Sequence, residues 1–283
     1  MKKKILVTGG VGFIGSNLIK ELIRHGHTLI SLDNYSTGSK KNEIDGVKYI
    51  NDDISNINKI DDNFDLCFHL ASQSRVQPSF SNPVESLRVN VNGTSSVMEW
   101  ARKNNIKVVY AGSSSRHHDP SDSPYAMYKF LGEEVCKLYR KSFNLKVEIA
   151  RFYNVYGPGE NIDEKYGNVI GIWKSKVLKG EPLPIVGDGE QKRDFIHVDD
   201  IVDGLIKISL SSIEHKDAWE LGTGVNYSVN ELFNLFKERF GVQSINIPNQ
   251  SGNYPETLRI NNDMLDLLKW IPKDRLKQHI NSF

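Results

Sequence analysis

The chain has 283 residues, about twice a typical domain, so one large domain or two smaller ones fit this length. Its 36 basic residues nearly balance its 35 acidic residues, which argues against nucleic acid or an anionic membrane as the main partner. Cys67 and Cys136 lie far apart with no C-x-x-C, so we expect neither a zinc site nor a disulfide framework, and a reducing, cytoplasmic location. No apolar run approaches the ~20 residues of a membrane span, and residues 5–7 are too few for a secretory core.

Short apolar segments alternate with helical patterns through the first half of the chain. Strands this apolar, separated by helices, predict a parallel sheet covered on both faces. The expected strands are residues 5–7, 28–32, 47–50, 64–70, 108–111 and 146–152, and the expected helices are 19–24, 83–104 and 125–143.

From about residue 156 the pattern changes to Gly/Pro-rich turns, with shorter helices expected at 168–178 and 229–240. We therefore expect a smaller second region at the C-terminal end of the chain.

A glycine-rich turn follows the first strand and opens the first helix. Gly9 permits a tight turn, Gly12 lets the backbone approach a pyrophosphate, and Gly15 lets the helix pack on the strand. The helix N-terminus then offers free N–H groups to phosphates. Asp33 ends the second strand, where its carboxylate can accept hydrogen bonds from an adenosine ribose and repel a 2′-phosphate; the alternative role is a turn cap.

These features predict an α/β fold with a Rossmann-type doubly wound parallel sheet that binds NAD rather than NADP. We expect the NAD-binding domain at residues 1–155, with the chain returning to it near 190–225, and a smaller C-terminal substrate-binding region at 156–283.

Further motifs extend along most of the chain: T-G-G-x-G-F-I-G at 8–15, H-L-A at 69–71, N-V-N-G-T at 90–94, Y-x-x-x-K at 125–129, R-F-Y-N at 151–154 and R-D-F-I-H-V-D-D at 193–200. As an ordered set, they resemble the extended short-chain dehydrogenase/reductase family, and within it the UDP-glucose 4-epimerase-like branch of nucleotide-sugar epimerases and dehydratases. The resemblance implies NAD as the cofactor and a nucleotide sugar as the substrate.

Tyr125 and Lys129 lie one helical turn apart and share a face. A nearby ammonium is expected to lower the tyrosine pKa from ~10 towards neutrality, so Tyr125 can act as general base for a sugar hydroxyl. A solvated helix face is the alternative for this motif. The resemblance implies that Lys129 holds the nicotinamide ribose, that Ser113 hydrogen-bonds the reacting oxygen and Tyr125, and that Ser114 contacts substrate. Ser115 has either a functional role or only a place in a serine-rich turn.

The remaining site residues are implied by the resemblance. Asn168 and Arg193 match positions that hold the substrate diphosphate, a role that suits a guanidinium; an exposed turn is the alternative for Arg193. No metal site is expected, His69 is expected in the core, and His117 and His118 in a solvated loop. The further cofactor-binding residues are Phe13, Ile14, Asn34, Ser36, Thr37, Gly38, Asp53, Ile54, Leu70, Ala71, Ser72, Asn90 and Tyr153, and the further substrate-binding residues are Asn154 and Arg259.

The sequence departs from the family pattern after the serines. Arg116, His117 and His118 stand where the family usually has Val-Tyr-Gly, and Tyr125 follows Ser113 after only 12 residues. A shortened segment of this kind predicts a more open sugar site, or new polar contacts from Arg116 and the histidines.

The motifs favour a nucleotide-sugar 4-epimerase acting on a UDP-hexose or UDP-N-acetylhexosamine through a transient 4-keto sugar. A 4,6-dehydratase, a decarboxylase and a keto-reductase are the alternatives, and dehydration is disfavoured because Ser114 and Ser115 replace the usual acids. A non-catalytic binding module is a third class, against which the retained serine, tyrosine and lysine argue.

The resemblance also implies a homodimer paired through helices 83–104 and 125–143. The large side chains of these helices can belong to the core instead: Met98, Trp100, Cys136 and Tyr139.

Overall fold

The computed structural model describes residues 2–283, which belong to two compact units. The first unit comprises Met1–Arg151 and Val202–Trp219, and the second comprises Phe152–Ile201 and Glu220–Phe283. The chain thus leaves the first unit, returns to it, and ends in the second.

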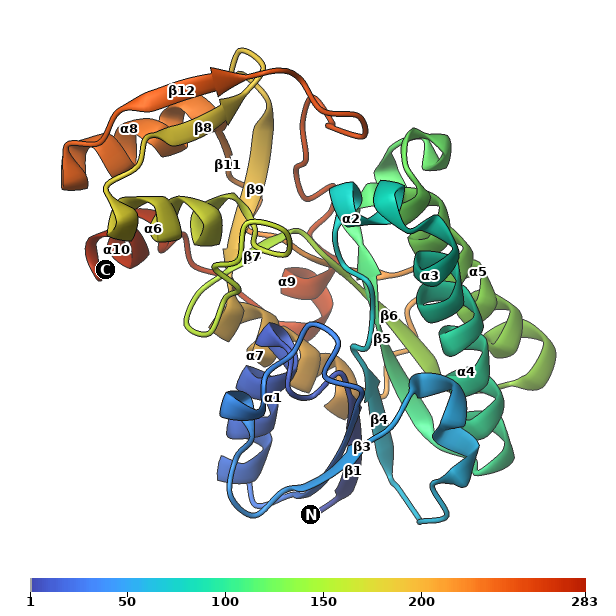
Figure 1. Cartoon of the computed structure of the whole chain (residues 1–283). Coiled ribbons are helices and arrows are strands. Elements are labelled where there is room, and N and C mark those ends of the chain that lie inside the picture. The colour runs from blue at the N-terminus through green and yellow to red at the C-terminus, as the bar shows by residue number, and fades with distance from the viewer. Residues whose placement is uncertain (1) are drawn as a thin grey trace. The chain divides into compact units, whose positions relative to one another are not determined.

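The first unit is built on a sheet of seven strands in the order β10-β6-β5-β4-β1-β2-β3, drawn in Figure 1. The pairs β1–β2, β2–β3, β1–β4 and β4–β5 are parallel, and the strand order reverses at β1, whose neighbours are β2 and β4. This order confirms the predicted Rossmann-type fold and places its ligand-binding edge beyond the ends of β1 and β4. The strands are β1 (Lys4–Thr8), β2 (Thr28–Asp33), β3 (Lys48–Asn51), β4 (Leu66–His69), β5 (Lys107–Ser113), β6 (Val147–Phe152) and β10 (Trp219–Leu221).

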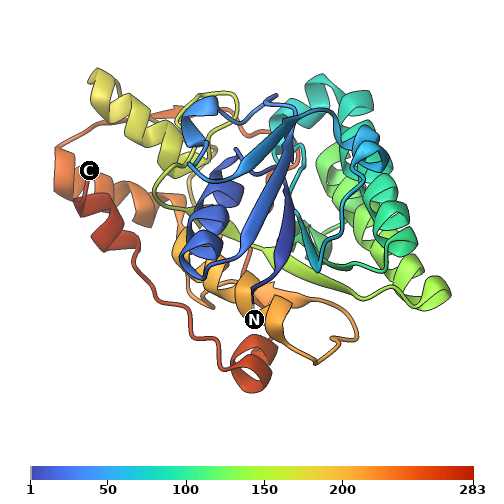
Figure 2. The ribbon, with the colours of Figure 1, turned by 90° about the horizontal axis from the view of Figure 1, so that it is seen from below.

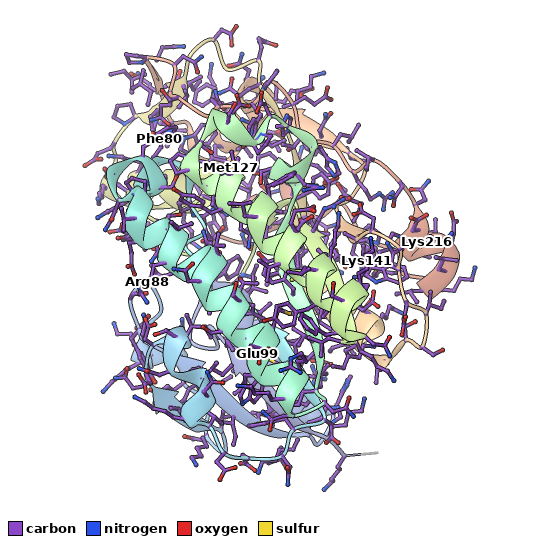
Figure 3. All side chains as sticks on the ribbon, turned by 90° about the vertical axis from the view of Figure 1, so that its right-hand side faces the viewer. Phe80, Arg88, Glu99, Met127, Lys141 and Lys216 are labelled. Atoms are coloured by element: carbon purple, nitrogen blue, oxygen red, sulfur yellow. The ribbon has the colours of Figure 1, made fainter. Side chains whose placement is uncertain are left out.

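Helices cover both faces of this sheet, as Figures 1 and 2 show. On one face lies α1 (Phe13–Arg24), and on the other lie α3 (Pro83–Leu87), α4 (Thr94–Lys103) and α5 (Pro124–Phe143). Figure 3 shows α4 and α5 running side by side. The Ser123 side chain caps the start of α5 by accepting the Ala126 N–H, and Asn144 ends the helix in the left-handed region.

The expected single helix over 83–104 is interrupted. A π-helical turn, Arg88–Gly93, separates α3 from α4, and such turns are frequent at functional sites. Met98, Trp100 and Cys136 are buried in the core of the unit, with Tyr139 packed against it. The core alternative is therefore the one observed for these side chains. A short helix that the sequence analysis did not anticipate, α2 (Val76–Ser81), precedes them.

The second unit contains a three-stranded sheet, β11-β9-β7, and a two-stranded sheet, β12-β8. Its core gathers Trp173, Leu183, Phe195 and Phe236. The helices expected at 168–178 and 229–240 are α6 and α8, and the sequence analysis missed the other elements, including a strand, β9, that runs directly into α7. The elements are β7 (Asn154–Tyr156), α6 (Val169–Lys179), β8 (Leu183–Val186), β9 (Lys192–His197), α7 (Val198–Leu210, which continues into the first unit), β11 (Asn226–Ser228), α8 (Val229–Phe240), β12 (Ser244–Ile247), α9 (Asp263–Leu268) and α10 (Leu276–Asn281).

Among residues 2–283, no helix combines the length and the apolar character that crossing a membrane requires.

Candidate active site

The glycine-rich turn after β1 has the geometry of a phosphate cradle. Gly9 adopts a left-handed φ of 74°, and a Cβ atom there would come within 2.8 Å of the Ala71 backbone nitrogen. A Cβ on Gly15 would collide with the Gly9 carbonyl oxygen. Helix α1 begins at Phe13 with no side chain capping its first amides, since Gly12 is the N-cap. These free N–H groups fit a pyrophosphate, so the turn fits a dinucleotide.

Asp33 ends β2, and its carboxylate is bound to the cradle. One oxygen accepts the Val11 N–H at 3.1 Å and the other accepts the Tyr35 N–H at 2.8 Å. Burial raises the pKa of Asp33, and these two hydrogen bonds oppose the rise. The carboxylate is therefore a turn cap, and its contact with a ribose remains a prediction. The loop that follows returns to the cradle, where the Asn42 side chain donates to the Val11 carbonyl at 2.8 Å; this loop carries Asn34, Ser36, Thr37 and Gly38.

Asp53 is held by an arginine that the sequence analysis missed. The Arg88 guanidinium donates to both Asp53 oxygens, at 2.8 and 2.9 Å, and the Asn34 side chain donates to one of them at 3.2 Å. The Arg88 hydrogen bonds hold the pKa of Asp53 well below its usual range. Ile54 follows, buried against Gly93 of the π-helical turn. Their place beside an adenine remains a prediction.

The segment after β4 is fixed by Asn90, which lies in the π-helical turn. The Asn90 side-chain oxygen accepts the Ser72 hydroxyl at 3.1 Å and the Gln73 N–H at 2.9 Å. This contact orders the segment that contains Leu70, Ala71 and Ser72. His69 is fully buried in the core, as expected.

Ser113, Tyr125 and Lys129 come together at the end of β5 and the start of α5. The Tyr125 hydroxyl donates to the Ser113 hydroxyl at 3.2 Å, and the Ser115 hydroxyl donates to the same oxygen at 2.9 Å. Because Ser113 accepts in both contacts, its own hydrogen is not used in either and can be donated to a sugar oxygen. Lys129 is only 4% exposed, which excludes the solvated helix face. Ser115 is part of the hydroxyl cluster, and Ser114 is buried next to it.

The expected effect of Lys129 on Tyr125 is not observed in this arrangement. Burial raises the pKa of Tyr125, opposed by the Ser113 hydrogen bond and the Arg75 charge. The Lys129 ammonium donates to the Ala111 carbonyl at 2.6 Å and to the Ser72 hydroxyl at 3.5 Å. The expected lowering of the tyrosine pKa is therefore wrong for the chain by itself, because burial outweighs it and the lysine is aimed at the strand end.

The shortened segment between Ser113 and Tyr125 is held down by local caps. Ser113, Asp119 and Ser123 each accept a backbone N–H two or three residues further on. The 3₁₀ turns Ser114–His117 and Pro120–Asp122 fill the space between these caps.

Arg116 lies against α5 rather than in a free loop. Its guanidinium is 4.0 Å from the Phe130 ring centroid and 2.9 Å from the Glu134 carboxylate. His117 and His118 lie in and just after the 3₁₀ turn and are half-buried, so the segment predicted as a solvated loop is partly solvated at these two residues. The alternative of Arg116 as a new polar contact for substrate is not supported by these pairings.

In the second unit, Tyr153 and Asn154 are both engaged by the protein. The Tyr153 hydroxyl donates to the buried Glu220 carboxylate at 2.8 Å, and its ring lies against Gly222. The Asn154 side chain donates to the Thr257 hydroxyl at 3.1 Å. Asn168 caps α6 and donates to the Val155 carbonyl at 2.7 Å. The predicted ligand contacts of these three side chains remain predictions.

Arg193 is a half-buried cation that donates to neutral groups. Its guanidinium donates to the Lys192 carbonyl and to the Asn253 side-chain oxygen. Burial lowers the pKa of Arg193 to about 10. A guanidinium in this setting is suited to an anion. The exposed-turn alternative is therefore wrong for Arg193, which lies on β9.

Asp194, which the sequence analysis did not assign, fixes the position of Arg259. The fully buried Asp194 carboxylate accepts the N–H groups of Thr223, Gly224 and Arg259, at 2.8, 2.9 and 3.1 Å. The Arg259 guanidinium donates to the Gly222 carbonyl and to Asn262. The sequence did contain a signal for this role: Asp194 lies between Arg193 and the apolar end of the strand. A carboxylate buried at such a position needs several hydrogen-bond donors.

Comparison with known proteins agrees with this architecture. Residues 5–222 match the model of a protein family described as the NAD dependent epimerase/dehydratase family. A provisionally named UDP-glucose 4-epimerase of Methanocaldococcus jannaschii is 36% identical, over 98% of this chain and 95% of that protein.

Two further similarities bear on activity. The crystal structure of a UDP-glucose 4-epimerase from Thermotoga maritima with UDP-glucose shares 27% identity at a TM-score of 0.91, covering 98% of this chain and 96% of that one. UDP-glucuronic acid decarboxylase 1 of Xenopus tropicalis is 29% identical over 85% of this chain and 61% of its own length.

Proposed function

Since this chain belongs to the NAD-dependent epimerase/dehydratase family, we propose that it is a nucleotide-sugar 4-epimerase, with a UDP-hexose or UDP-N-acetylhexosamine as substrate. The observation that carries the proposal is the hydroxyl cluster of Ser113, Ser115 and Tyr125 above a buried Lys129. This arrangement can move one proton on and off a sugar hydroxyl.

The chain's own residues have separate tasks in this reaction. Bound NAD would supply reversible hydride transfer at C4 of the sugar, with no net redox change. The residues that fit its pyrophosphate are Gly9, Gly12 and Gly15, and Asp33 fits its adenosine ribose. Tyr125 takes the proton of the C4 hydroxyl and later returns it, while Ser113 donates a hydrogen bond to the reacting oxygen. The 4-keto sugar presents its other face before it is reduced.

The position of acids argues against dehydration. Glu133 is the carboxylate that contacts the Ser113 backbone, and Arg151 occupies it through hydrogen bonds of 2.8 to 3.2 Å. A carboxylate in this pairing is not free to exchange protons with C5 or C6 of a sugar. Decarboxylation is the second candidate, because a relative named for it covers 85% of this chain.

In the second unit, Arg193 supports a diphosphate-bearing substrate, because its guanidinium donates to the uncharged Lys192 carbonyl and Asn253 side chain. Arg259, Asn154 and Asn168 are proposed for the same substrate.

Proton NMR of the purified protein, incubated without added NAD, tests the reaction. Separate tubes contain UDP-glucose, UDP-N-acetylglucosamine and UDP-glucuronate. We expect a C4 epimer in at least one tube, no product with Tyr125→Phe, and normal turnover with Tyr128→Phe, a control on the same helix. A decarboxylated product from UDP-glucuronate would support the second candidate. Retained turnover in Tyr125→Phe would contradict the assigned base.

We also propose a cytoplasmic location, which the free thiols of Cys67 and Cys136 support. A further proposal is a homodimer paired through α4 and α5. Since Met98, Trp100 and Cys136 are core residues, outer side chains such as Leu138, which is 53% exposed, would form the contact. Light scattering of eluted protein should give twice the 32.1 kDa chain mass, and Leu138→Glu should give the single mass.

A further inference from the structure

A buried glutamate lies below the candidate catalytic residues. Glu133 is on α5, one helical turn after Lys129 and two turns after Tyr125, so the three share a face of the helix. Its side chain is 1% exposed. An ionised carboxylate in such a place is costly unless it is paired and hydrogen-bonded, so its partners need an account.

Two arginines from two other segments surround this carboxylate. Arg151, at the end of β6, donates from Nη2 to Oε2 at 2.8 Å and from Nε to both oxygens at 3.1 and 3.2 Å. The Nε atom of Arg116 lies 3.9 Å from Oε2. Arg151 shares its charge with Asp217, whose Oδ2 accepts from Nη1 at 2.8 Å.

The carboxylate also touches the strand end that carries Ser113. The Ser113 N–H donates to Oε1 of Glu133 at 3.4 Å, and a Cβ atom on Gly112 would come within 2.7 Å of the same oxygen. These contacts link the end of β5 to α5 and therefore affect how closely the Ser113 hydroxyl approaches Tyr125.

We propose that Glu133 is a positioning residue that holds Ser113 against Tyr125 and keeps the buried Lys129 ammonium protonated. This inference rests on the roles proposed above for those three residues. It assigns a task to a carboxylate that is not among the residues proposed above to bind sugar or cofactor.

The charges around Lys129 give the direction of the second effect. Burial lowers the pKa of Lys129 to about 8, and the negative charge of Glu133 is the largest influence that opposes the fall, followed by Cys136. The other groups that face the ammonium are the Tyr110 ring, 5.0 Å away, the Ala111 carbonyl, the Ser72 hydroxyl and buried His69. Glu133 itself also faces Tyr110 and Tyr125, whose pKa values it raises. Removing its charge should therefore make Lys129 lose its proton at a lower pH.

Glu133→Gln tests the proposal, with Asp217→Asn as the matched control. Both variants remove one carboxylate from Arg151, but Asp217 pairs with Arg151 and Lys137 rather than with Ser113 or Lys129. The protein is labelled with ¹³C at lysine Cε, and Lys129→Met identifies the Lys129 resonance. Titration of this resonance needs no turnover.

In Glu133→Gln we expect the Lys129 midpoint to fall by about one pH unit, as removal of a nearby opposite charge does. The alkaline limb of kcat for epimerisation should move with it. At pH 7.5 the lost Lys129 proton alone should lower kcat about threefold. The displaced Ser113 hydroxyl should bring the total fall to at least tenfold, about 1.4 kcal/mol in the barrier, with KM within threefold. Asp217→Asn should leave the midpoint and kcat near their wild-type values.

An unchanged Lys129 midpoint in folded Glu133→Gln would overturn the proposal, as would equal changes in the two variants, because both results would leave Glu133 only an anchor for Arg151. If the wild type epimerises none of the sugars, the proposed function fails while the titration still decides this inference. If Glu133→Gln does not fold, Glu133→Asp replaces it with Glu134→Asp as control. In Glu133→Asp the carboxylate is one methylene further from Ser113 and Lys129. The Lys129 midpoint and kcat should therefore both fall, by less than in Glu133→Gln, and the absence of both changes would overturn the proposal.

Discussion

The Nδ1 atom of His69 lies 2.8 Å from the Thr8 hydroxyl, between two neighbouring strands of the sheet. On its other side, Nε2 lies 3.2 Å from the Thr94 hydroxyl, which donates to the Asn90 carbonyl. Thr94 therefore accepts from Nε2, and Nδ1 accepts from Thr8, which is the pattern of a neutral imidazole. Burial lowers the pKa of His69 to about 3.

This relationship predicts a loss of stability in acid. Below pH 6.5 the unfolded chain protonates His69 and the folded chain does not, so the free energy of unfolding falls as the pH falls, by up to about 1.4 kcal/mol per pH unit, until the folded pKa is reached. Urea unfolding at pH 7.5, 6 and 5 should show the stability advantage of wild type over His69→Gln shrinking along this slope. His25→Gln, at the half-exposed C-cap of α1, is the control. Parallel pH curves for wild type and His69→Gln would contradict the prediction.

A second prediction concerns the hydroxyl cluster. Ser113→Ala removes the group proposed to donate to the reacting oxygen, and kcat should fall by about 10²-fold with little change in KM, which is the usual cost of one such donor. Ser115→Ala should stay within about fivefold of wild type, because Ser115 only donates to Ser113. Steady-state epimerase assays measure both. Similar losses in the two variants would mean that the cluster acts as a packing unit.

Arg193 provides a prediction about binding. Arg193→Gln should weaken UDP binding at least tenfold, since a charge-assisted hydrogen bond contributes about 1.5–3 kcal/mol. Titration calorimetry with UDP measures the dissociation constant without catalysis. Arg239→Gln, at an arginine of α8 that stacks on the Phe240 ring, should leave it within twofold. Unchanged binding in Arg193→Gln would remove this residue from the proposed diphosphate contacts.

Lys107 should contribute to the stability of the first unit. Its ammonium donates to the carbonyls of Ile208, Ser209 and Ser211, at 3.2, 3.1 and 2.9 Å, and so caps the C-terminal end of α7. Lys107→Met should lower the free energy of unfolding by about 1–3 kcal/mol, because three part-buried carbonyls lose their donor. Lys103→Met, at an exposed ion pair on α4, should change it by less than about 0.5 kcal/mol. Equal urea midpoints for wild type and Lys107→Met would contradict the capping role.

The sequence predicted the first unit better than the second for a physical reason. The central strands of the parallel sheet are buried on both faces and therefore appear as continuous apolar runs, such as residues 5–7 and 108–111. The second unit uses strands of three to six residues with mixed polarity, such as β9, whose Lys192 and Arg193 mask its apolar end. The π-helical turn at Arg88–Gly93 was also beyond prediction, because one extra residue per turn leaves no compositional signal.

At the candidate site, the spacing of residues could be predicted from the sequence and their electrostatic surroundings could not. Spacing alone brought Tyr125 and Lys129 to one helix face, and the structure joins Tyr125 to Ser113 as the resemblance implied. The electrostatic environment was not predictable, because burial depends on segments far away in sequence. Lys129 is an example: burial lowers its pKa, and the Glu133 carboxylate opposes the fall. Glu133 had a signal, its spacing of one turn from Lys129.

The succession of caps between Ser113 and Tyr125 has a consequence for how ligands exchange. Each cap closes its own turn, and Arg116 in the middle of the segment forms an ion pair with Glu134. We therefore expect the segment to stay in place rather than to move away from the rest of the unit. We expect the rim formed by this segment to be the same before and after a sugar arrives. The rate of product release should then depend on the contacts of the product itself. Insertion of even one residue into this segment should lower kcat more than it weakens substrate binding.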